Sequence, residues 1–335
     1  METGIVDQEK HWDYFAEFIR YEMAVGGPDP HMVLVGHMSE DVSWHERVWH
    51  GICYVSVYNT PTAEALWRTW PWAAVVDNRE RLEVWLRTHW KGIATRRERR
   101  SVRSAEKLAH CLADGAEWVQ RCEPFFDIGS PPSLARYETM WNSCQRIYAL
   151  GRYATIKLLE YFGRYCGLSS RMPDMRARGG WSPREALAML YPEHASVLTG
   201  DDSEATLRHV DGLAVKGRQF LLEKYGLSLD NFLFQVMLCD YKQSYVGRRQ
   251  YPGRSHDSEL EYARVVSAHF GGESDMWATR RRLFPSRALG ELSGWSGVRK
   301  ELGGVLRDFG YTWSDIRFSY LASKDDLAHP VAWEM

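Results

Sequence analysis

The sequence predicts a mainly α-helical protein with at most a small β element. Signals for helix starts are frequent, as at Thr60-Pro61, where a capping hydroxyl precedes a proline at the first helical position. From Leu134 to Arg164, apolar residues recur every three or four positions, which is the period of one helix face. Only two short runs resemble strands, Met32 to Val35 and Ile52 to Val57.

Length and composition are those of an ordinary globular protein. The chain has 335 residues, of which 44% are hydrophobic and 26% charged, so it can bury the core of one large domain or two smaller ones. We expect a helical catalytic domain over residues 1–270, which the Pro-rich segment 124–132 could divide into two lobes, and a C-terminal extension over 271–335.

No apolar stretch approaches a membrane span and the start does not resemble a signal peptide, which favours a soluble, intracellular protein.

Cysteine spacing and charge exclude several classes of site. The six cysteines include no CxxC pair, so we expect small buried thiols rather than a zinc knuckle or a disulfide framework. The formal net charge of −2 argues against a protein held on DNA by bulk charge alone, but it leaves room for a local basic groove. The 15 tryptophans are unusual, and aromatic rings that are not in the core can stack on unpaired bases.

A basic stripe is predicted on a helix from Ala94 to Leu112. Its four cations, Arg96, Arg100, Arg103 and Lys107, follow one another at intervals of four, three and four residues. Such a stripe can track DNA phosphates, although a solvated helix face is the alternative.

A second polar face is predicted on the long helix from Leu134 to Arg164. It carries Arg146, Tyr153, Lys157, Glu160 and Arg164, with Arg152 beside them. Gly151 would then lie inside a helix, where glycine costs about 1 kcal/mol relative to alanine. Either a ligand approaches the backbone at Gly151 or two helices pack tightly there.

Two further segments combine polar groups with loop signals. The first comprises residues 239–243 and 248–259. In it, acidic, basic, amide and guanidinium groups alternate with aromatic residues over a loop rich in glycine and proline. Asp257 and Ser258 could simply begin a helix, but that reading leaves Lys242, Arg254 and His256 unexplained. The second is Asn59, whose amide could read a base edge or bond to its own backbone.

Four motifs, taken in their order along the chain, resemble those of a known family. They are Tyr58-Asn59-Thr60-Pro61, Gly151-Arg152-Tyr153 with Lys157, Gly179-Gly180-Trp181-Ser182-Pro183-Arg184, and Asp240-Tyr241-Lys242 with Tyr251-Pro252-Gly253-Arg254. They resemble the bacteriophage amino acid:DNA transferases, a group similar to the alpha-glutamyl/putrescinyl thymine pyrophosphorylases and distantly to helix-hairpin-helix DNA glycosylases. The resemblance covers residues 40–265. The glycosylase hairpin and its catalytic aspartate are absent from the sequence, so the resemblance does not extend to cleavage of the N-glycosidic bond.

The resemblance implies a reaction and a set of site residues. A kinase phosphorylates 5-hydroxymethyluracil in phage DNA, and the transferase replaces that phosphate with the amine of an amino acid. The expected catalytic residues are Asp240, Lys242, His256 and Asp257. The expected substrate-binding residues are Tyr58, Asn59, Arg152, Tyr153, Lys157, Gln243 and Arg254. Tyr58 and Asn59 would hold the flipped base, Arg152 and Lys157 the phosphate, and Arg254 the amino-acid carboxylate. The general base would be Asp240, His256 or Asp257.

The implied partners are double-stranded phage DNA carrying a modified thymine, a free amino acid as co-substrate and, functionally, the DNA-base kinase. No metal and no other cofactor is expected, and the location would be the host cytoplasm.

The loop over 240–259 should meet the polar face of the long helix in one cleft, since phosphate release and amine activation act on one base. A DNA glycosylase that excises a modified base and a non-enzymatic DNA-binding phage protein are the alternatives.

Overall fold

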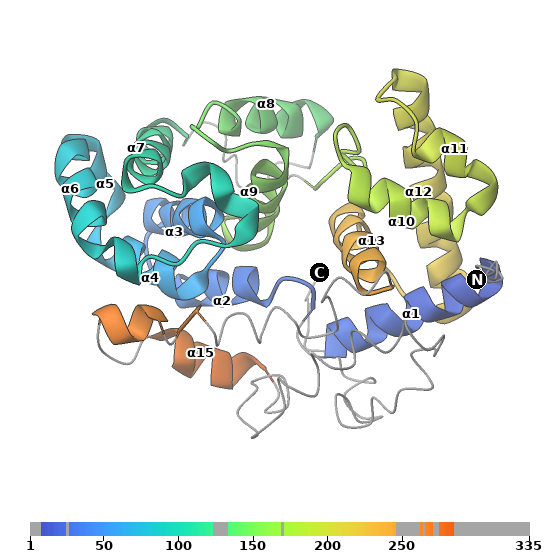
Figure 1. Ribbon diagram of the computed structural model, residues 1–335, viewed down its shortest axis with the longest axis horizontal. Helices are drawn as coiled ribbons and strands as arrows, with labels where there is room; N and C mark the ends of the chain where they lie inside the picture. The colour runs from blue at the N-terminus through green and yellow to red at the C-terminus, as the bar shows by residue number, and fades with distance from the viewer. Residues whose placement is uncertain are drawn as a thin grey trace. The chain divides into compact units, whose positions relative to one another are not determined.

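A computed structural model of the chain describes residues 8–24, 27–122, 133–168, 171–245, 262–263, 265–270 and 275–284 (Figure 1). These residues are mostly helical and include no strand, which confirms the mainly α fold. They form two compact units, and the chain enters unit 2 after Pro28 and returns to unit 1 after Arg171. The described residues 262–263, 265–270 and 275–283 belong to unit 2 again. The residues on both sides of 124–132 belong to the same unit. The expected division into a catalytic domain over 1–270 and an extension over 271–335 stays a prediction.

Unit 1 consists of α1 and the helices from α10 to α13. Their bounds are α1 Gln8–Ala24, α10 Trp181–Leu190, α11 Ala195–Leu198, α12 Glu204–Tyr225 and α13 Asn231–Tyr245, with a 3₁₀ turn at Pro192–His194. Helix α10 packs against α1, α11, α12 and α13. The core of this unit is rich in aromatic rings, with Trp12 lying edge-on to Tyr191 and to Phe220.

Unit 2 is built around α3, which packs against α2, α4, α7 and α9 (Figure 1). The bounds are α2 Pro30–Met38, α3 Trp44–Val57, α4 Thr60–Thr69, α5 Trp72–Asp77, α6 Arg79–His89, α7 Ala105–Arg121, α8 Leu134–Cys144, α9 Arg152–Tyr165 and α15 Asp275–Leu283, with 3₁₀ turns at Trp90–Gly92 and Arg97–Val102. Helices α5 and α6 pack on α7, α8 packs on α9, and α15 packs on α2.

Both runs that resembled strands are helical, so the expected small β element is wrong for those residues. The first run lies in α2 and the second in α3. Helix α2 begins where the Asp29 side chain accepts a hydrogen bond from the backbone of Met32, at 3.1 Å, with Pro30 at the first position. Every residue from Pro30 to Gly36 is buried, so no polar face interrupts the apolar run and the helical period is hidden.

The predicted long helix from Leu134 to Arg164 is two helices, α8 and α9, separated by a turn. Two contacts from elsewhere in unit 2 hold that turn. The Asp114 carboxylate accepts a hydrogen bond from the Tyr148 backbone at 3.0 Å, and Arg99 donates to the Ala149 carbonyl at 2.9 Å. Ala149 adopts a left-handed conformation, φ 61°, which a continuing helix excludes. Gly151 is therefore the N-cap of α9 rather than a residue inside a helix.

The predicted helix from Ala94 to Leu112 is likewise wrong over its first half, since α7 begins only at Ala105. The preceding segment is tied to α3 and α4 by its backbone. Ala94 donates to the Thr62 hydroxyl at 3.1 Å, and Arg96 donates to the Val57 carbonyl at 3.0 Å. These bonds hold Arg96 in an extended conformation and a short 3₁₀ turn follows it, so the 3.6-residue period has no structural meaning there.

Glycine at position 51 allows α3 and α9 to pack closely. A Cβ atom there would overlap the ring of Tyr161, which is fully buried and whose hydroxyl bonds to Ser39 and to the Arg47 carbonyl. We expect Gly51→Ala to lower the free energy of unfolding by about 1–3 kcal/mol, because the overlap outweighs the gain in helix propensity.

Gly212 in α12 is the matched control for that substitution. A Cβ there meets no atom within 4 Å, so Gly212→Ala should raise the free energy of unfolding by about 0.5–1 kcal/mol. Urea unfolding followed by circular dichroism measures both variants. Equal stability of the two variants would contradict the close approach of α3 and α9.

Two further sequence expectations can be compared with the structure. All six cysteines are free thiols, as expected, and five of them are buried. Within the described ranges, no helix combines the length and apolar character needed to cross a membrane.

Candidate functional site

Unit 2 contains a buried polar cluster centred on the carboxylate of Asp29. This carboxylate accepts hydrogen bonds from the Lys157 ammonium at 2.6 Å and from the Tyr54 hydroxyl at 2.8 Å, besides capping α2. Asp29 and Lys157 are each 3% exposed. The cluster therefore joins the start of α2 to α3 and α9 through one charged group.

The charge on Asp29 is stabilised by its neighbours. Burial alone would raise the pKa of Asp29, but the charges of Lys157 and His31 and the hydrogen bonds from Lys157 and Tyr54 outweigh burial and lower that pKa. The carboxylate of Asp29 is thus ionised at neutral pH. An ion pair so deeply buried stabilises the fold only while both partners are present.

Two tyrosines from separate motifs meet beside this cluster. The Tyr58 hydroxyl donates to the Tyr153 carbonyl at 3.4 Å, and the rings lie edge to face with centroids 5.5 Å apart. Lys157 lies 5.7 Å from the centre of the Tyr153 ring. Burial raises the pKa of Tyr58 well above its usual value, so its phenol remains a neutral donor. The structure therefore brings together three of the predicted substrate-binding residues.

Tyr58 has a left-handed backbone conformation, φ 53° and ψ 41°, at the end of α3. Such a conformation costs roughly 1 kcal/mol in a residue other than glycine, and strain of this kind is frequent at functional sites. The left-handed turn at Tyr58 redirects the chain before Asn59. Asn59 is buried and caps α4 by accepting a hydrogen bond from the Thr62 backbone at 2.9 Å. The helix cap is Asn59 rather than Thr60, and its expected contact with a base stays a prediction.

The four cations of the basic stripe do not share one helix face. Arg96 contacts His31, while Arg103 lies between the 3₁₀ turn and α7 and only Lys107 belongs to α7. Arg103 and Lys107 are both exposed, and the side chain of Arg100 lies outside the described part. The geometric basis for the stripe is therefore wrong, while a role for these residues at the DNA backbone stays a prediction.

In unit 1, the third motif surrounds the buried guanidinium of Arg184. This group donates to the Asp202 carboxylate at 2.6 Å and to three carbonyls, those of Leu198 at 2.6 Å, Gly200 at 2.9 Å and Asp201 at 3.0 Å. Its side chain is fully buried. One residue of α10 thus fixes the whole loop between α11 and α12.

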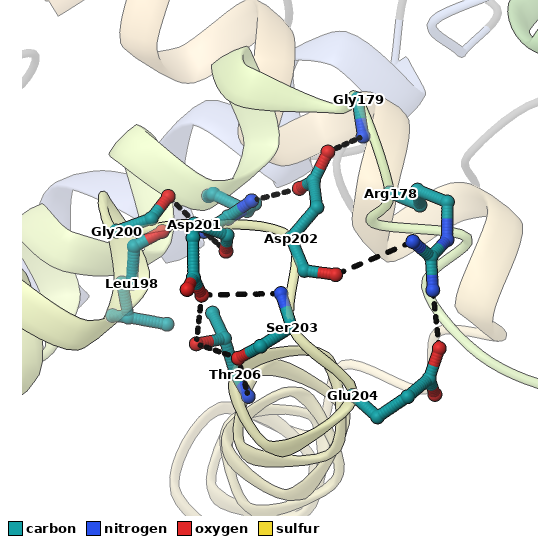
Figure 2. Close-up of polar contacts among 10 residues, drawn as sticks. Arg178, Gly179, Leu198, Gly200, Asp201, Asp202, Ser203, Glu204 and Thr206 are labelled. Atoms are coloured by element: carbon teal, nitrogen blue, oxygen red, sulfur yellow. Dashed lines mark hydrogen bonds and ion pairs between the residues drawn. The ribbon is translucent and has the colours of Figure 1, made fainter.

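Asp202 links that loop back to the start of the motif (Figure 2). Its second carboxylate oxygen accepts a hydrogen bond from the Gly179 backbone at 3.0 Å, and Arg178 reaches both the Asp202 carbonyl and the Glu204 carboxylate. Gly179 has a φ of 66°, a conformation that favours glycine. The glycine pair of the motif therefore shapes the chain directly before α10.

The motif at the end of α13 lies against the motif at the start of α10. Lys242 forms an ion pair with Glu185, and the Gln243 amide donates to the Ser182 hydroxyl at 3.2 Å. The Lys242 side chain is 12% exposed, so its ammonium is mostly shielded from water. Two motifs about sixty residues apart in the chain thus form one polar surface within unit 1, with Asp240 half-buried on the same helix.

Three predicted site residues, Arg254, His256 and Asp257, lie outside the described residues. The expected cleft between 240–259 and the polar face of the long helix depends on them and stays a prediction. Glu160 and Arg164 of that face form an ion pair with each other on α9, and Arg152 occupies its first turn. Arg146 instead lies in the turn between α8 and α9.

Several residues of these clusters were not predicted from the sequence. Asp29 is not among the predicted site residues, although an aspartate directly before a proline is a helix-start signal. Arg99 is not among them either, but it is 4% exposed and donates to the Ser56 carbonyl at 3.2 Å. No local pattern distinguishes such a buried arginine from its exposed neighbours.

The described residues contain no group of three or more histidine, cysteine, aspartate or glutamate side chains that could hold a metal ion. Comparison with curated proteins and with solved structures found no match. One family model, described as Amino acid:DNA transferase, matches residues 51–250, well over half of the chain. The match includes every motif from Tyr58 to Lys242, in both units. The chain therefore belongs to the amino acid:DNA transferase family.

Proposed function

We propose that this transferase attaches an amino acid to phosphorylated 5-hydroxymethyluracil in double-stranded phage DNA and displaces phosphate. The substrate base is flipped out of the duplex, and a DNA-base kinase acting in the same host cytoplasm supplies the phosphoryl group. Family membership over residues 51–250 is the observation that carries this proposal, since it establishes an amino acid and DNA as the two substrates.

The proposed step is a substitution at the exocyclic carbon of the base. The amine nitrogen forms a bond to that carbon, the carbon–oxygen bond to phosphate breaks, and the bonding electrons leave with the phosphate. The nitrogen loses one proton to a general base, for which Asp240, His256 and Asp257 remain the candidates. No redox change occurs and no further reactant is consumed.

The polar surface of unit 1 supplies groups that such a step needs. A leaving phosphate requires a nearby cation, which Lys242 provides at the end of α13. A base needs hydrogen-bonding groups at its edge, which Gln243 and Ser182 provide in unit 1. The structure changes one expected role, because Lys157 already neutralises Asp29, and we assign Lys157 to holding the site together rather than to binding phosphate.

Mass spectrometry of nucleosides tests the proposal. DNA containing phosphorylated 5-hydroxymethyluracil is incubated with the protein and a mixture of amino acids. We expect a nucleoside heavier than the 5-hydroxymethyluracil nucleoside by the mass of one amino-acid residue. One inorganic phosphate should be released per modified base. Abasic sites would instead identify a glycosylase, and unchanged nucleosides would reject the proposed substrate.

Variants connect the reaction to the polar surface of unit 1. Lys242→Met should lower kcat roughly a hundredfold, which is the size of effect expected when one charged donor to a leaving group is removed. Lys216 on α12 is exposed and provides the control, since Lys216→Met should leave the rate unchanged.

A further inference from the structure

Two aromatic side chains stand apart from the others in their exposure. Among the phenylalanine, tyrosine and tryptophan side chains whose burial is described, only Tyr153 and Trp181 are largely exposed, at 41% and 49%. Each lies in the first turn of a helix that begins at a glycine, and each lies in one of the four motifs. Single exposed apolar side chains are ordinary on protein surfaces, so exposure alone assigns neither ring a role, and what distinguishes the two rings is their place in the motifs and their contacts.

Trp181 is held in place from within unit 1. The guanidinium carbon of Arg184 lies 4.8 Å from the centre of the indole ring, which is a cation–π arrangement. Arg184 is itself fixed by four hydrogen bonds to the loop between α11 and α12. A half-exposed ring on so rigid a support loses little conformational freedom when a flat ligand binds to it.

The surroundings of Trp181 also fit a nucleobase. Ser182 follows it in the first turn of α10 and receives a hydrogen bond from Gln243, so the turn that carries the ring also carries a hydroxyl bound to an amide. An aromatic surface bordered by a few hydrogen-bonding groups is how proteins hold an unstacked base. The glutamine lies on α13 and reaches the first turn of α10, which carries the indole.

We infer that Trp181 stacks on the nucleobase that receives the amino acid, after that base has left the duplex. Arg184 acts as a positioning residue that holds the indole. The inference rests on transfer to a base in DNA as proposed above, but it does not depend on which group leaves from that base.

Photochemical crosslinking tests this contact without any variant. Duplex DNA in which 5-iodouracil replaces thymine is bound to the full-length protein and irradiated, and the crosslinked peptides are identified by mass spectrometry. We expect a crosslink at Trp181. Crosslinks confined to other residues would overturn the inference. The assay needs no turnover, so its result stands even if the phosphate-displacement assay fails.

Binding measurements separate stacking from simple apolar contact. Trp181→Leu should weaken binding to DNA with one phosphorylated 5-hydroxymethyluracil about 5- to 150-fold, the range expected for loss of one base–aromatic stack. Trp181→Phe should keep most of the affinity. The control is Val215→Ala on α12, a side chain that is 53% exposed outside the motifs and should not alter binding.

Replacing the target base by an abasic residue completes a double-mutant cycle. If Trp181 contacts that base, Trp181→Leu should have no further effect on the abasic duplex, since the partner is already missing. An equal loss of affinity on both duplexes, or a leucine variant that binds like the wild type, would refute stacking on the target base. Circular dichroism checks that the variants remain folded.

Discussion

Asp29→Asn should lower the free energy of unfolding by about 3–5 kcal/mol, which is the usual effect of removing one partner from a buried ion pair. Asparagine still accepts the hydrogen bonds from Tyr54 and from the Met32 backbone, so the loss comes mainly from the charge. The Lys157 ammonium would then be buried without its counter-charge at the interface of α2, α3 and α9. Chemical denaturation at pH 7 gives the value.

A second substitution distinguishes the charge from packing. Adding Lys157→Met to Asp29→Asn removes the uncompensated ammonium and should restore much of the lost stability. Glu83→Gln, which breaks the exposed pair with Arg87, should cost no more than about 0.5 kcal/mol. A double variant no more stable than Asp29→Asn alone would contradict the ion-pair explanation.

The same pair predicts how stability depends on pH. The folded-state pKa of Asp29 is lowered from its ordinary value, so its contribution is fully present above the unfolded-state pKa of about 4. That contribution should disappear as the pH falls from about 4 through the lower folded-state pKa. The difference in stability between wild type and Asp29→Asn should therefore shrink as the pH falls below about 4.

Arg184→Met should also lower the free energy of unfolding by about 3–5 kcal/mol. The substitution removes four directed donors and leaves three carbonyls and the Asp202 carboxylate to find new partners. Lysine carries the same charge but cannot reproduce the planar fork of donors, so Arg184→Lys should lose most of the same stability. Thermal and urea unfolding measure both variants.

Arg178 is the matched control, since it reaches the same loop from an exposed position. Its side chain is 61% exposed and paired with Glu204, so Arg178→Met should change stability by less than about 1 kcal/mol. Hydrogen exchange provides a local measurement, because the amides of 198–202 should lose protection in Arg184→Met and keep it in Arg178→Met. Equal effects of the two substitutions would show that the buried guanidinium does not organise the loop.

The sequence predicted the helical class well because amphipathic periods and capping signals act over only a few residues. The Asn59–Pro61 segment shows this, since its polar cap and proline begin α4 in the structure, one residue from the expected cap. Periodicity failed where tertiary contacts override it. At 145–151 the pattern continues, but Asp114 and Arg99 bind the chain and Ala149 turns left-handed, so the helix ends.

Arg99 shows why the candidate sites could be predicted only in part. One guanidinium binds carbonyls on two sides, at Ser56 near the strained Tyr58 and at Ala149 near the start of α9, so it fixes the segments that carry two motifs. Nothing in its local sequence separates it from the exposed Arg103. Asp29 and Lys157 are 128 residues apart in the chain, and only folding makes one the counter-charge of the other.

The helical class, the order of the four motifs and, through them, the family follow from the amino-acid sequence alone. Those properties depend on local spacing and on residue identity, which the chain carries in any conformation. The tertiary structure decided which charges are buried and paired, which helices break, and which aromatic rings stay exposed on the motif segments. Each of these depends on neighbours distant in the chain, because burial and the electrostatic partners of a side chain are set by packing and not by its place in the sequence.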